Sequence, residues 1–203
     1  MKKFGLTGSI AVGKSFVCEC FRELGCHVMD ADRAAREVVA AGTDGLAAVV
    51  SEFGEGVLTP GGELDRKRLA SIVFTDSARR ERLNAIVHPL VIEVQDRWLA
   101  GREAEDPTGI AIVDAALMIE SGGYRRFDEI IVVWCDPAIQ LKRFMLRDNL
   151  SESEAISRIN AQMPQEEKKR FATHLIDTSA GHDDTQRQVA EIYRGWRAAG
   201  TAE

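Results

Sequence analysis

The sequence lacks any apolar run approaching the roughly 20 residues that a membrane-spanning helix needs. No apolar segment with a cleavage site follows the two N-terminal lysines, so no signal peptide is expected. It also has no long basic run, because 26 lysines and arginines stand against 32 aspartates and glutamates, for a formal net charge of −6. These absences disfavour a membrane or a nucleic acid as partner and favour a cytoplasmic protein.

Cysteine is scarce. The four cysteines form no C-x-x-C pair and no framework typical of small secreted domains; they are Cys18, Cys20, Cys26 and Cys135. On a helix, Cys18 and Cys20 would point to different sides, which makes a zinc site with Cys26 geometrically awkward. We therefore expect all four to be small buried apolar side chains.

The chain also lacks internal repeats and low-complexity linkers. With 203 residues it can bury one good core, so we expect a single domain over residues 1–203. One short basic cluster, residues 168–170 (KKR), directly follows Glu166 and Glu167. This pattern predicts a solvated helix face.

What the sequence does contain is the octapeptide GSIAVGKS at residues 8–15, which satisfies G-x-x-x-x-G-K-[ST]. An apolar run at 3–7 suits a buried strand, and apolar residues then recur at helical spacing until Gly25. In such a loop the glycines let backbone N–H groups approach phosphates, the lysine supplies charge, and the Ser15 hydroxyl can bind magnesium. The motif predicts a nucleotide-phosphate site.

Four further apolar runs predict the remaining strands of a parallel sheet, at residues 26–30, 109–114, 130–134 and 174–177. Acidic residues follow two of them, Asp30 and Asp32 after one and Asp114 at the end of another. Open α/β sheets bind ligands at this edge. A carboxylate there can accept a proton from a hydroxyl or help to hold magnesium, although one of the first pair can instead cap the next helix.

The sequence predicts a helical insertion over residues of about 33 to 105 and a core made of residues 1–32 and 106–203. The helices expected there are 34–41, 44–53, 65–73, 77–87 and 90–100, the last with Pro89 in its first turn. The insertion forms the wall of an acceptor pocket or merely covers one edge of the sheet. Its polar candidates are Asp65, Arg66 and His88, of which His88 is equally compatible with a helix cap or a core hydrogen bond.

A lid is expected over about 137–165. Asp136 precedes Pro137 as a helix cap, Arg143 and Arg147 share one helix face, and residues 151–154 form a capping box for a second helix. Arginines that close over phosphates stabilise the charge of phosphoryl transfer and exclude water. The other interpretation is an ordinary charged surface. A turn at 178–182 and a helix at 185–197 complete the chain.

Together these segments resemble the dephospho-coenzyme A kinase family over nearly the whole chain. The matching stretches, in the family's order and spacing, are LTG at 6–8, GKS at 13–15, DAD at 30–32, LDR at 64–66, LNAIVHP at 83–89, Asp114, and QLKR at 140–143. The resemblance implies a three-layer P-loop kinase fold. It also implies transfer of the ATP γ-phosphoryl to the ribose 3′-hydroxyl of dephospho-coenzyme A with Mg²⁺, by a monomer or weak homo-oligomer.

The resemblance also assigns roles. Asp32 would be the base or orienting group for the hydroxyl, with Lys14 and Arg143 as the other catalytic residues and Ser15 as the metal ligand. The ATP contacts implied are Gly8, Ala11, Val12, Gly13, Lys14, Ser15, Phe16 and Arg143. The acceptor contacts implied are Asp32, Asp65, Arg66, His88 and Asp114.

The chain departs from the family pattern in three respects. The loop, usually GGIGSGKST, has Ser9, Ala11 and Val12 here, which tightens it but leaves the required glycines and the N–H donors. Phe16 replaces a threonine whose hydroxyl could touch a phosphate. Ala116 replaces a proline that commonly follows the strand-end acid, so the geometry of that loop is less defined.

Three other functions remain alternatives. A related small-molecule kinase for a nucleoside monophosphate or a sugar acid is disfavoured by the long insertion and the DAD triplet. A GTP-dependent switch would need an N-K-x-D motif, and no asparagine is followed by lysine in this sequence. A non-catalytic nucleotide-binding protein is disfavoured because Lys14, Ser15 and Asp32 are all present.

Overall fold

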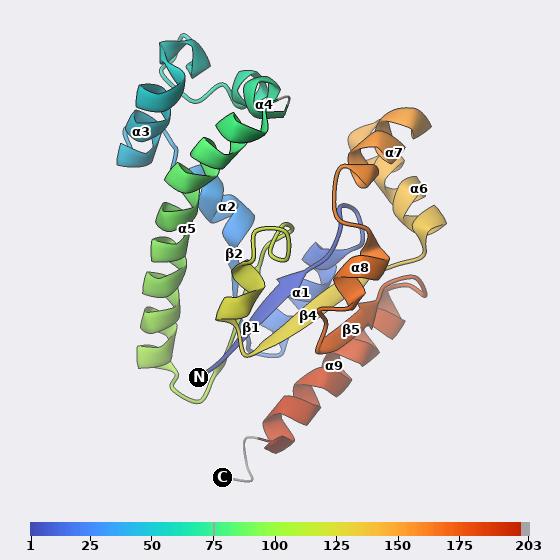
Figure 1. Ribbon diagram of the computed structural model, residues 1–203. Coiled ribbons are helices and arrows are strands. Elements are labelled where there is room, and N and C mark those ends of the chain that lie inside the picture. The colour runs from blue at the N-terminus through green and yellow to red at the C-terminus, as the bar shows by residue number, and fades with distance from the viewer. Residues whose placement is uncertain (75, 200–203) are drawn as a thin grey trace. The chain divides into compact units, whose positions relative to one another are not determined.

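A five-stranded sheet organises the computed structural model, which describes residues 1–74 and 76–199 (Figure 1). The strand order is β2-β3-β1-β4-β5, and β1 pairs in parallel with both β3 and β4 while β4 pairs in parallel with β5. The strands are β1 (Lys2–Thr7), β2 (His27–Asp30), β3 (Ile110–Asp114), β4 (Glu129–Trp134) and β5 (His174–Asp177). All five lie within a residue or two of the predicted runs, which confirms the predicted fold class.

The chain divides into two compact units. The sheet unit comprises Met1–Met29 and the chain from Arg102 onward, and the helical unit comprises Asp30–Gly101. Helices of the sheet unit are α1 (Lys14–Glu23), α6 (Pro137–Asp148), α7 (Glu152–Asn160), α8 (Gln165–Lys169) and α9 (His182–Ala199), with a 3₁₀ turn η2 (Gly123–Arg126). The helical unit contains α2 (Ala31–Glu37), α3 (Asp44–Phe53), η1 (Glu55–Val57) and α4 (Arg66–Phe74), and α5 (Ser77–Glu105) runs from it into the sheet unit.

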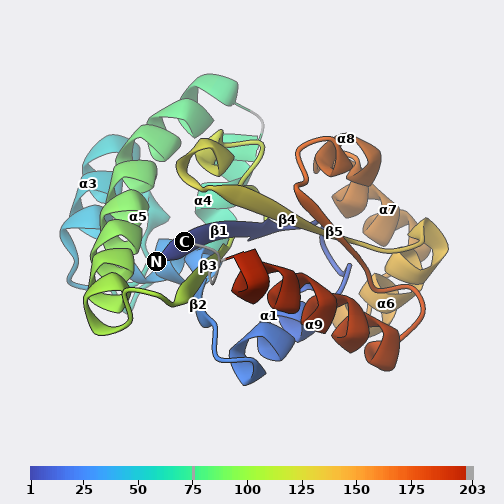
Figure 2. The same cartoon turned by 90° about the horizontal axis from the view of Figure 1, so that it is seen from below.

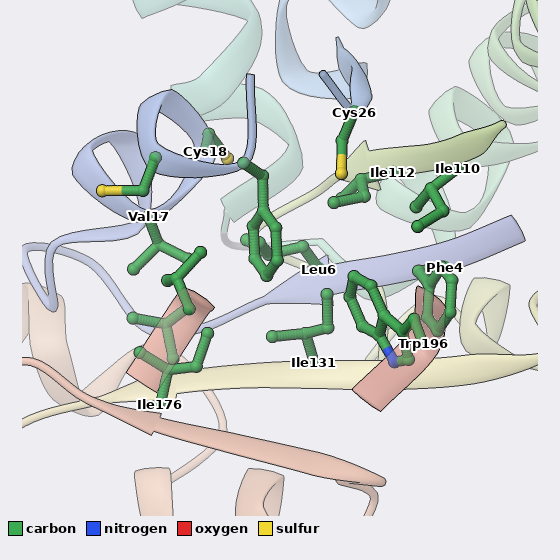
Figure 3. Packing of buried hydrophobic residues seen from close by; sticks show 14 of the residues in the cluster. Phe4, Leu6, Val17, Cys18, Cys26, Ile110, Ile112, Ile131, Ile176 and Trp196 are labelled. Carbon is green, nitrogen blue, oxygen red and sulfur yellow. The ribbon is translucent and has the colours of Figure 1, made fainter. Parts of the chain in front are cut away.

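The main core lies between the sheet and the α1–α9 pair, which covers one face (Figure 2). Phe4 on β1 stacks on Trp196 of α9 with ring centroids 3.9 Å apart, and isoleucines of β3 and β4 lie around them (Figure 3). Helix α8 lies on the opposite side of the sheet (Figure 2). The central strands are therefore covered on both faces, as their continuous apolar sequences require. All four cysteines are buried, as predicted.

The helical unit has its own core of Val39, Val49, Val57 and Leu69, against which residues of α5 such as Ile86 pack. The prediction of two helices meeting at Pro89 is wrong, because α5 continues through this proline. Proline inside a helix removes one backbone hydrogen bond and crowds the carbonyl one turn earlier, a cost of about 3 kcal/mol that packing must offset. The turns preceding it are held by packing of Leu83, Ile86 and Val87.

Two other boundaries, and the burial of one basic side chain, differ from prediction. Helix α2 begins at Ala31 and ends at Glu37, because Asp30 caps it by accepting a hydrogen bond from the N–H of Arg33. Helix α9 begins at His182, inside the predicted turn. The basic cluster on α8 is not wholly solvated: the Lys168 side chain is 1% exposed because it pairs with Glu120 beneath it.

Candidate active site

The loop between β1 and α1 has the backbone that its glycines allow. A Cβ at Gly8 would lie 2.4 Å from the carbonyl oxygen of Val133, so no side chain fits there. Gly13 has a φ of +94°, in the left-handed region, and directly precedes α1. The loop therefore presents its N–H groups at the positive end of a helix dipole, where anions bind.

Ala11 also lies in the left-handed region, with a φ of 61°. A residue with a Cβ is strained there, by roughly 1–2 kcal/mol. This is one of the positions at which the chain departs from the glycine-rich family pattern. Ala11 therefore places a Cβ at a position whose backbone conformation favours glycine.

Ile10, near the apex of the loop, is held on both sides of its backbone. Its N–H donates to Oε1 of Gln162 at 2.8 Å, and its carbonyl accepts from Nε2 of Gln140 at 2.7 Å. Gln140 lies on α6 and is buried, while Gln162 follows α7. Gln162 therefore occupies one of the loop's N–H donors.

Lys14 forms an ion pair with Asp114, with Nζ 3.0 Å from Oδ1. The two side chains are 15% and 14% exposed, so the pair is shielded but reachable from solvent. The Sγ of Cys18 lies 3.5 Å from the other carboxylate oxygen. Burial, followed by the Asp114 charge, raises the pKa of the Cys18 thiol, so Cys18 stays protonated and can donate to the carboxylate.

The segment after Asp114 is fixed by hydrogen bonds. Ala115 donates its N–H to the carbonyl of Leu6 at 3.0 Å, and the carbonyl of Ala116 accepts from Thr7 Oγ1 at 3.2 Å and from Lys168 Nζ at 2.8 Å. A proline at 116 would restrain φ but would add no donor or acceptor. The loop is therefore held in place although Ala116 replaces that proline.

Arg143 of α6 reaches the phosphate loop through Thr178, which follows β5. Its guanidinium donates to Thr178 Oγ1 and to the Thr178 carbonyl, both at 2.9 Å, and Thr178 Oγ1 donates to the Val12 carbonyl at 2.7 Å. Arg143 is thereby tied to a carbonyl of the same loop that carries Lys14. This placement makes it a candidate for binding nucleotide.

A cavity of about 130 Å³ opens beside this contact; its lining residues are Gly13, Phe16, Arg143, Thr178, His182 and Thr185. The rings of Phe16 and His182 stack with centroids 4.1 Å apart. Thr178, His182 and Thr185 were not among the predicted site residues. The position of residues 178–182 immediately after a parallel strand is the signal for Thr178 and His182, because ligands bind at that edge.

Four of the predicted acceptor contacts belong to the helical unit. Asp32 is exposed in the first turn of α2, whereas Asp30 serves as the cap. Arg66, at the start of α4, donates to the carbonyl of Arg36 in the last turn of α2 at 3.0 Å, while Asp65 accepts from a backbone N–H of its own helix. His88 is exposed within α5, so it is neither a helix cap nor a core residue.

Among the described residues, no cluster of three or more histidine, cysteine, aspartate or glutamate side chains is arranged to hold a metal ion. Ser15 lies exposed in the first turn of α1. In the same part of the chain, every helix is too short or too polar to cross a bilayer.

A G-x-x-x-x-G-K-S loop between the central strand and α1, a strand-end aspartate paired with its lysine, and an arginine bound across the loop define a P-loop kinase. The sequence profile of the dephospho-CoA kinase family matches residues 3–184. A dephospho-CoA kinase of Geobacter sulfurreducens is 45% identical over 95% of this chain and 98% of its own length. The chain belongs to the dephospho-CoA kinase family.

Solved structures agree with that assignment. A crystal structure of a Thermus thermophilus protein superposes with a TM-score of 0.85 at 30% identity, and it covers 96% of each chain. A dephospho-CoA kinase of Campylobacter jejuni gives a TM-score of 0.70 at 28% identity, again over 96% of each chain. The similarity therefore extends over both compact units and is not confined to the phosphate loop.

Proposed function

We propose that the protein transfers the γ-phosphoryl group of ATP to the ribose 3′-hydroxyl of dephospho-coenzyme A, giving coenzyme A and ADP. Membership of the family supports the ATP-dependent kinase activity. The observation that carries the proposal is the placement of two cations at the phosphate loop, Lys14 paired with Asp114 and Arg143 hydrogen-bonded to Thr178. These groups match what a transferring phosphoryl needs, namely positioning and cationic stabilisation.

ATP would bind along the loop toward the cavity. The loop N–H groups and Lys14 would hold the phosphates, and Arg143 would exchange part of its contact with Thr178 for the nucleotide. At about 130 Å³ the cavity is smaller than pockets of roughly 300–1,000 Å³ that enclose a whole drug-sized ligand. It would therefore take one ring of the nucleotide, which the Phe16–His182 pair would contact through a π-face.

Magnesium fits the oxygen donors at the start of α1. The Ser15 hydroxyl is a hard ligand, and the Asp114 carboxylate, which is at the end of β3, can act directly or through a water in the metal's shell. Magnesium uses few protein ligands and keeps several waters, so the absence of a larger acidic cluster is compatible with this site. When bound, the ion would neutralise charge on the phosphate oxygens.

The acceptor would be activated by Asp32, an exposed carboxylate at the start of α2. An ionised aspartate can orient a ribose hydroxyl and accept its proton as the new O–P bond forms. Asp65, Arg66 and His88, with Asp114, would contribute the remaining acceptor contacts. Helices α6 and α7, which carry Arg143 and Arg158, would form the lid that excludes water from the reaction.

Residues 33–105 would serve as the acceptor-binding insertion of a single domain whose core is residues 1–32 and 106–203, with the lid at about 137–165. The enzyme would work in the cytoplasm as a monomer or weak homo-oligomer.

The test is a mass-resolved assay of the purified protein with Mg·ATP and an equimolar mixture of dephospho-coenzyme A, AMP, adenosine and sugar acids. We expect one product, phosphorylated at the ribose 3′ position of dephospho-coenzyme A. Preferential phosphorylation of AMP or a sugar acid would instead identify a related small-molecule kinase. Tight ATP binding without any phosphorylated product would leave only a nucleotide-binding protein.

A further inference from the structure

Lys168 is a buried cation outside the residues assigned above. Its side chain is 1% exposed, and its Nζ lies 2.8 Å from Glu120 Oε1 and donates to the Ala116 carbonyl at 2.8 Å. Its neighbour Lys169, 18% exposed, pairs with Glu166 on the same helix, and its Nζ lies 3.4 Å from the ring centroid of Trp134. The two adjacent lysines of α8 therefore have different partners, and of the two only Lys168 contacts the segment after Asp114.

Stability alone gives no reason for this arrangement. Removing an ammonium group and a carboxylate from water is unfavourable, and well-packed apolar side chains usually replace a buried ion pair without loss of stability. Glu120 is 24% exposed, so only its partner is fully withdrawn from solvent. The presence of a buried lysine at 168 is better explained by the chain segment that its ammonium group holds in place.

Lys168 holds the chain segment that begins at Asp114. The Ala116 carbonyl, two residues after Asp114, accepts from Lys168, and Glu120 pairs with the same ammonium group four residues further on. Oε1 of Glu120 also accepts from the N–H of Met163, just before α8. Lys168 therefore bonds to both ends of the segment from Ala116 to Glu120.

The same stretch of chain also holds the phosphate loop. Gln162, Gln165 and Lys168 recur at every third position. They contact, respectively, Ile10 in the phosphate loop, the backbone of Cys135 after β4, and Ala116 after β3. Residues 162–168 thus connect the loops that follow three neighbouring strands, β3, β1 and β4.

We propose that Lys168 is a positioning residue for phosphoryl transfer: by holding Ala116 and Glu120, it keeps Asp114 opposite Lys14 on the phosphate loop. The proposal rests on the proposed function. Lys168 takes no part in bond making or breaking. Its effect is geometric, and a displacement of about 1 Å at reacting groups can lower a rate on the order of a hundredfold.

The test compares Lys168→Met, Glu120→Gln and the double variant with the wild type in the coenzyme A-forming assay. Lys169→Met, on the same helix, is the matched control. We expect Lys168→Met to lower kcat by about tenfold to a hundredfold and to raise the Mg²⁺ concentration needed for half-maximal rate. KM for ATP should change less than kcat, because the Arg143 cavity is untouched, and the control should remain within about twofold of wild type.

The double variant distinguishes positioning from a purely structural role. Neutralising both partners leaves no unpaired buried charge, so its melting temperature should return toward that of the wild type while kcat stays low. Recovery of kcat together with melting temperature would overturn the proposal, as would near-normal kcat in Lys168→Met. If the wild type itself makes no coenzyme A, the proposed function fails instead, which is a separate result.

Discussion

At the scale of single residues, the proposed chemistry depends most on Asp32. Changing it to asparagine removes the base but keeps the size of the side chain, so turnover should fall by about a hundredfold or more while ATP binding stays nearly normal. Steady-state kinetics and calorimetric titration with ATP measure the two quantities separately.

By contrast, Lys14→Ala should impair both turnover and ATP binding, because it deletes a charge aimed at the phosphates.

Asp30 provides a control two residues away. Its carboxylate caps α2, and asparagine caps helices about as well as aspartate, so Asp30→Asn should retain near-normal turnover. Equal losses in Asp30→Asn and Asp32→Asn would indicate that charge near α2 matters generally. A rate for Asp32→Asn close to that of wild type would remove Asp32 from the mechanism.

Ala11 is the residue at which backbone strain can be relieved. Ala11→Gly should raise the free energy of unfolding by about 0.5–1 kcal/mol, because relief of the left-handed strain exceeds the added entropy of the unfolded chain. Urea denaturation measures this change. Ala190→Gly, in the interior of α9, should have the opposite sign and cost about 1 kcal/mol. A destabilised Ala11→Gly would show that the alanine methyl packs favourably.

At the scale of secondary structure, α6 begins at a cap that can be tested directly. Asp136 accepts hydrogen bonds from the N–H groups of Ala138 and Ile139 at 2.8 and 3.3 Å. Asp136→Ala should lower the free energy of unfolding by about 1 kcal/mol, whereas Asp136→Asn should lower it much less because the amide oxygen still accepts. Similar losses in both variants, measured by denaturation, would point to charge at the helix terminus as the source.

The elements differ in how well the sequence predicts them. The strands and the caps at Asp136 and Ser151 follow from local patterns, and the structure places them where those patterns indicate. The continuation of α5 through Pro89 depends on packing of residues distant in the sequence, which no local signal records. Burial of Lys168 has the same origin, since its partner Glu120 lies on another segment.

The candidate site likewise depends on contacts between distant residues that local sequence patterns do not record. The comparisons confirm the predicted family and kinase activity, which rest on motifs with fixed spacing. Individual contacts are less accessible to sequence reasoning. The pairing of Lys14 with Asp114 joins two strand ends, and the predicted turn at 178–182 does not by itself indicate the contact between Thr178 and Arg143. The roles of the individual site residues, from Lys14, Ser15 and Arg143 to the acceptor contacts in the helical unit, stay predictions.

At the scale of the whole molecule, the buried thiols report on global unfolding. Burial raises the pKa of Cys26 to about 12, although Arg197 partly opposes this effect, and burial likewise raises the pKa of the other three thiols. At pH 8 the native protein should therefore react slowly with a disulfide reagent, and all four cysteines should react in denaturant. A thiol that reacts rapidly in the native state would reveal local opening.

These raised pKa values also determine how the thiols change the stability of the protein at alkaline pH. The native state keeps its thiols protonated at pH values where the unfolded chain, with an ordinary thiol pKa of 9.0, begins to lose protons. Because the unfolded state then binds fewer protons, the contribution of the thiols to stability decreases as the pH rises above about 9. More than about one pH unit below that value the thiols stay protonated in both states and contribute almost no pH dependence.

The position of β1 in the sheet has a consequence for synthesis on the ribosome. The first strand to emerge is the middle one, and its neighbours β3 and β4 are translated only after the whole helical unit. Until then both edges of an apolar strand lack their native partners, a state prone to aggregation. A nascent chain truncated anywhere before β4 would leave at least one of those edges unpaired, so partial products of this gene should be insoluble or bound by chaperones.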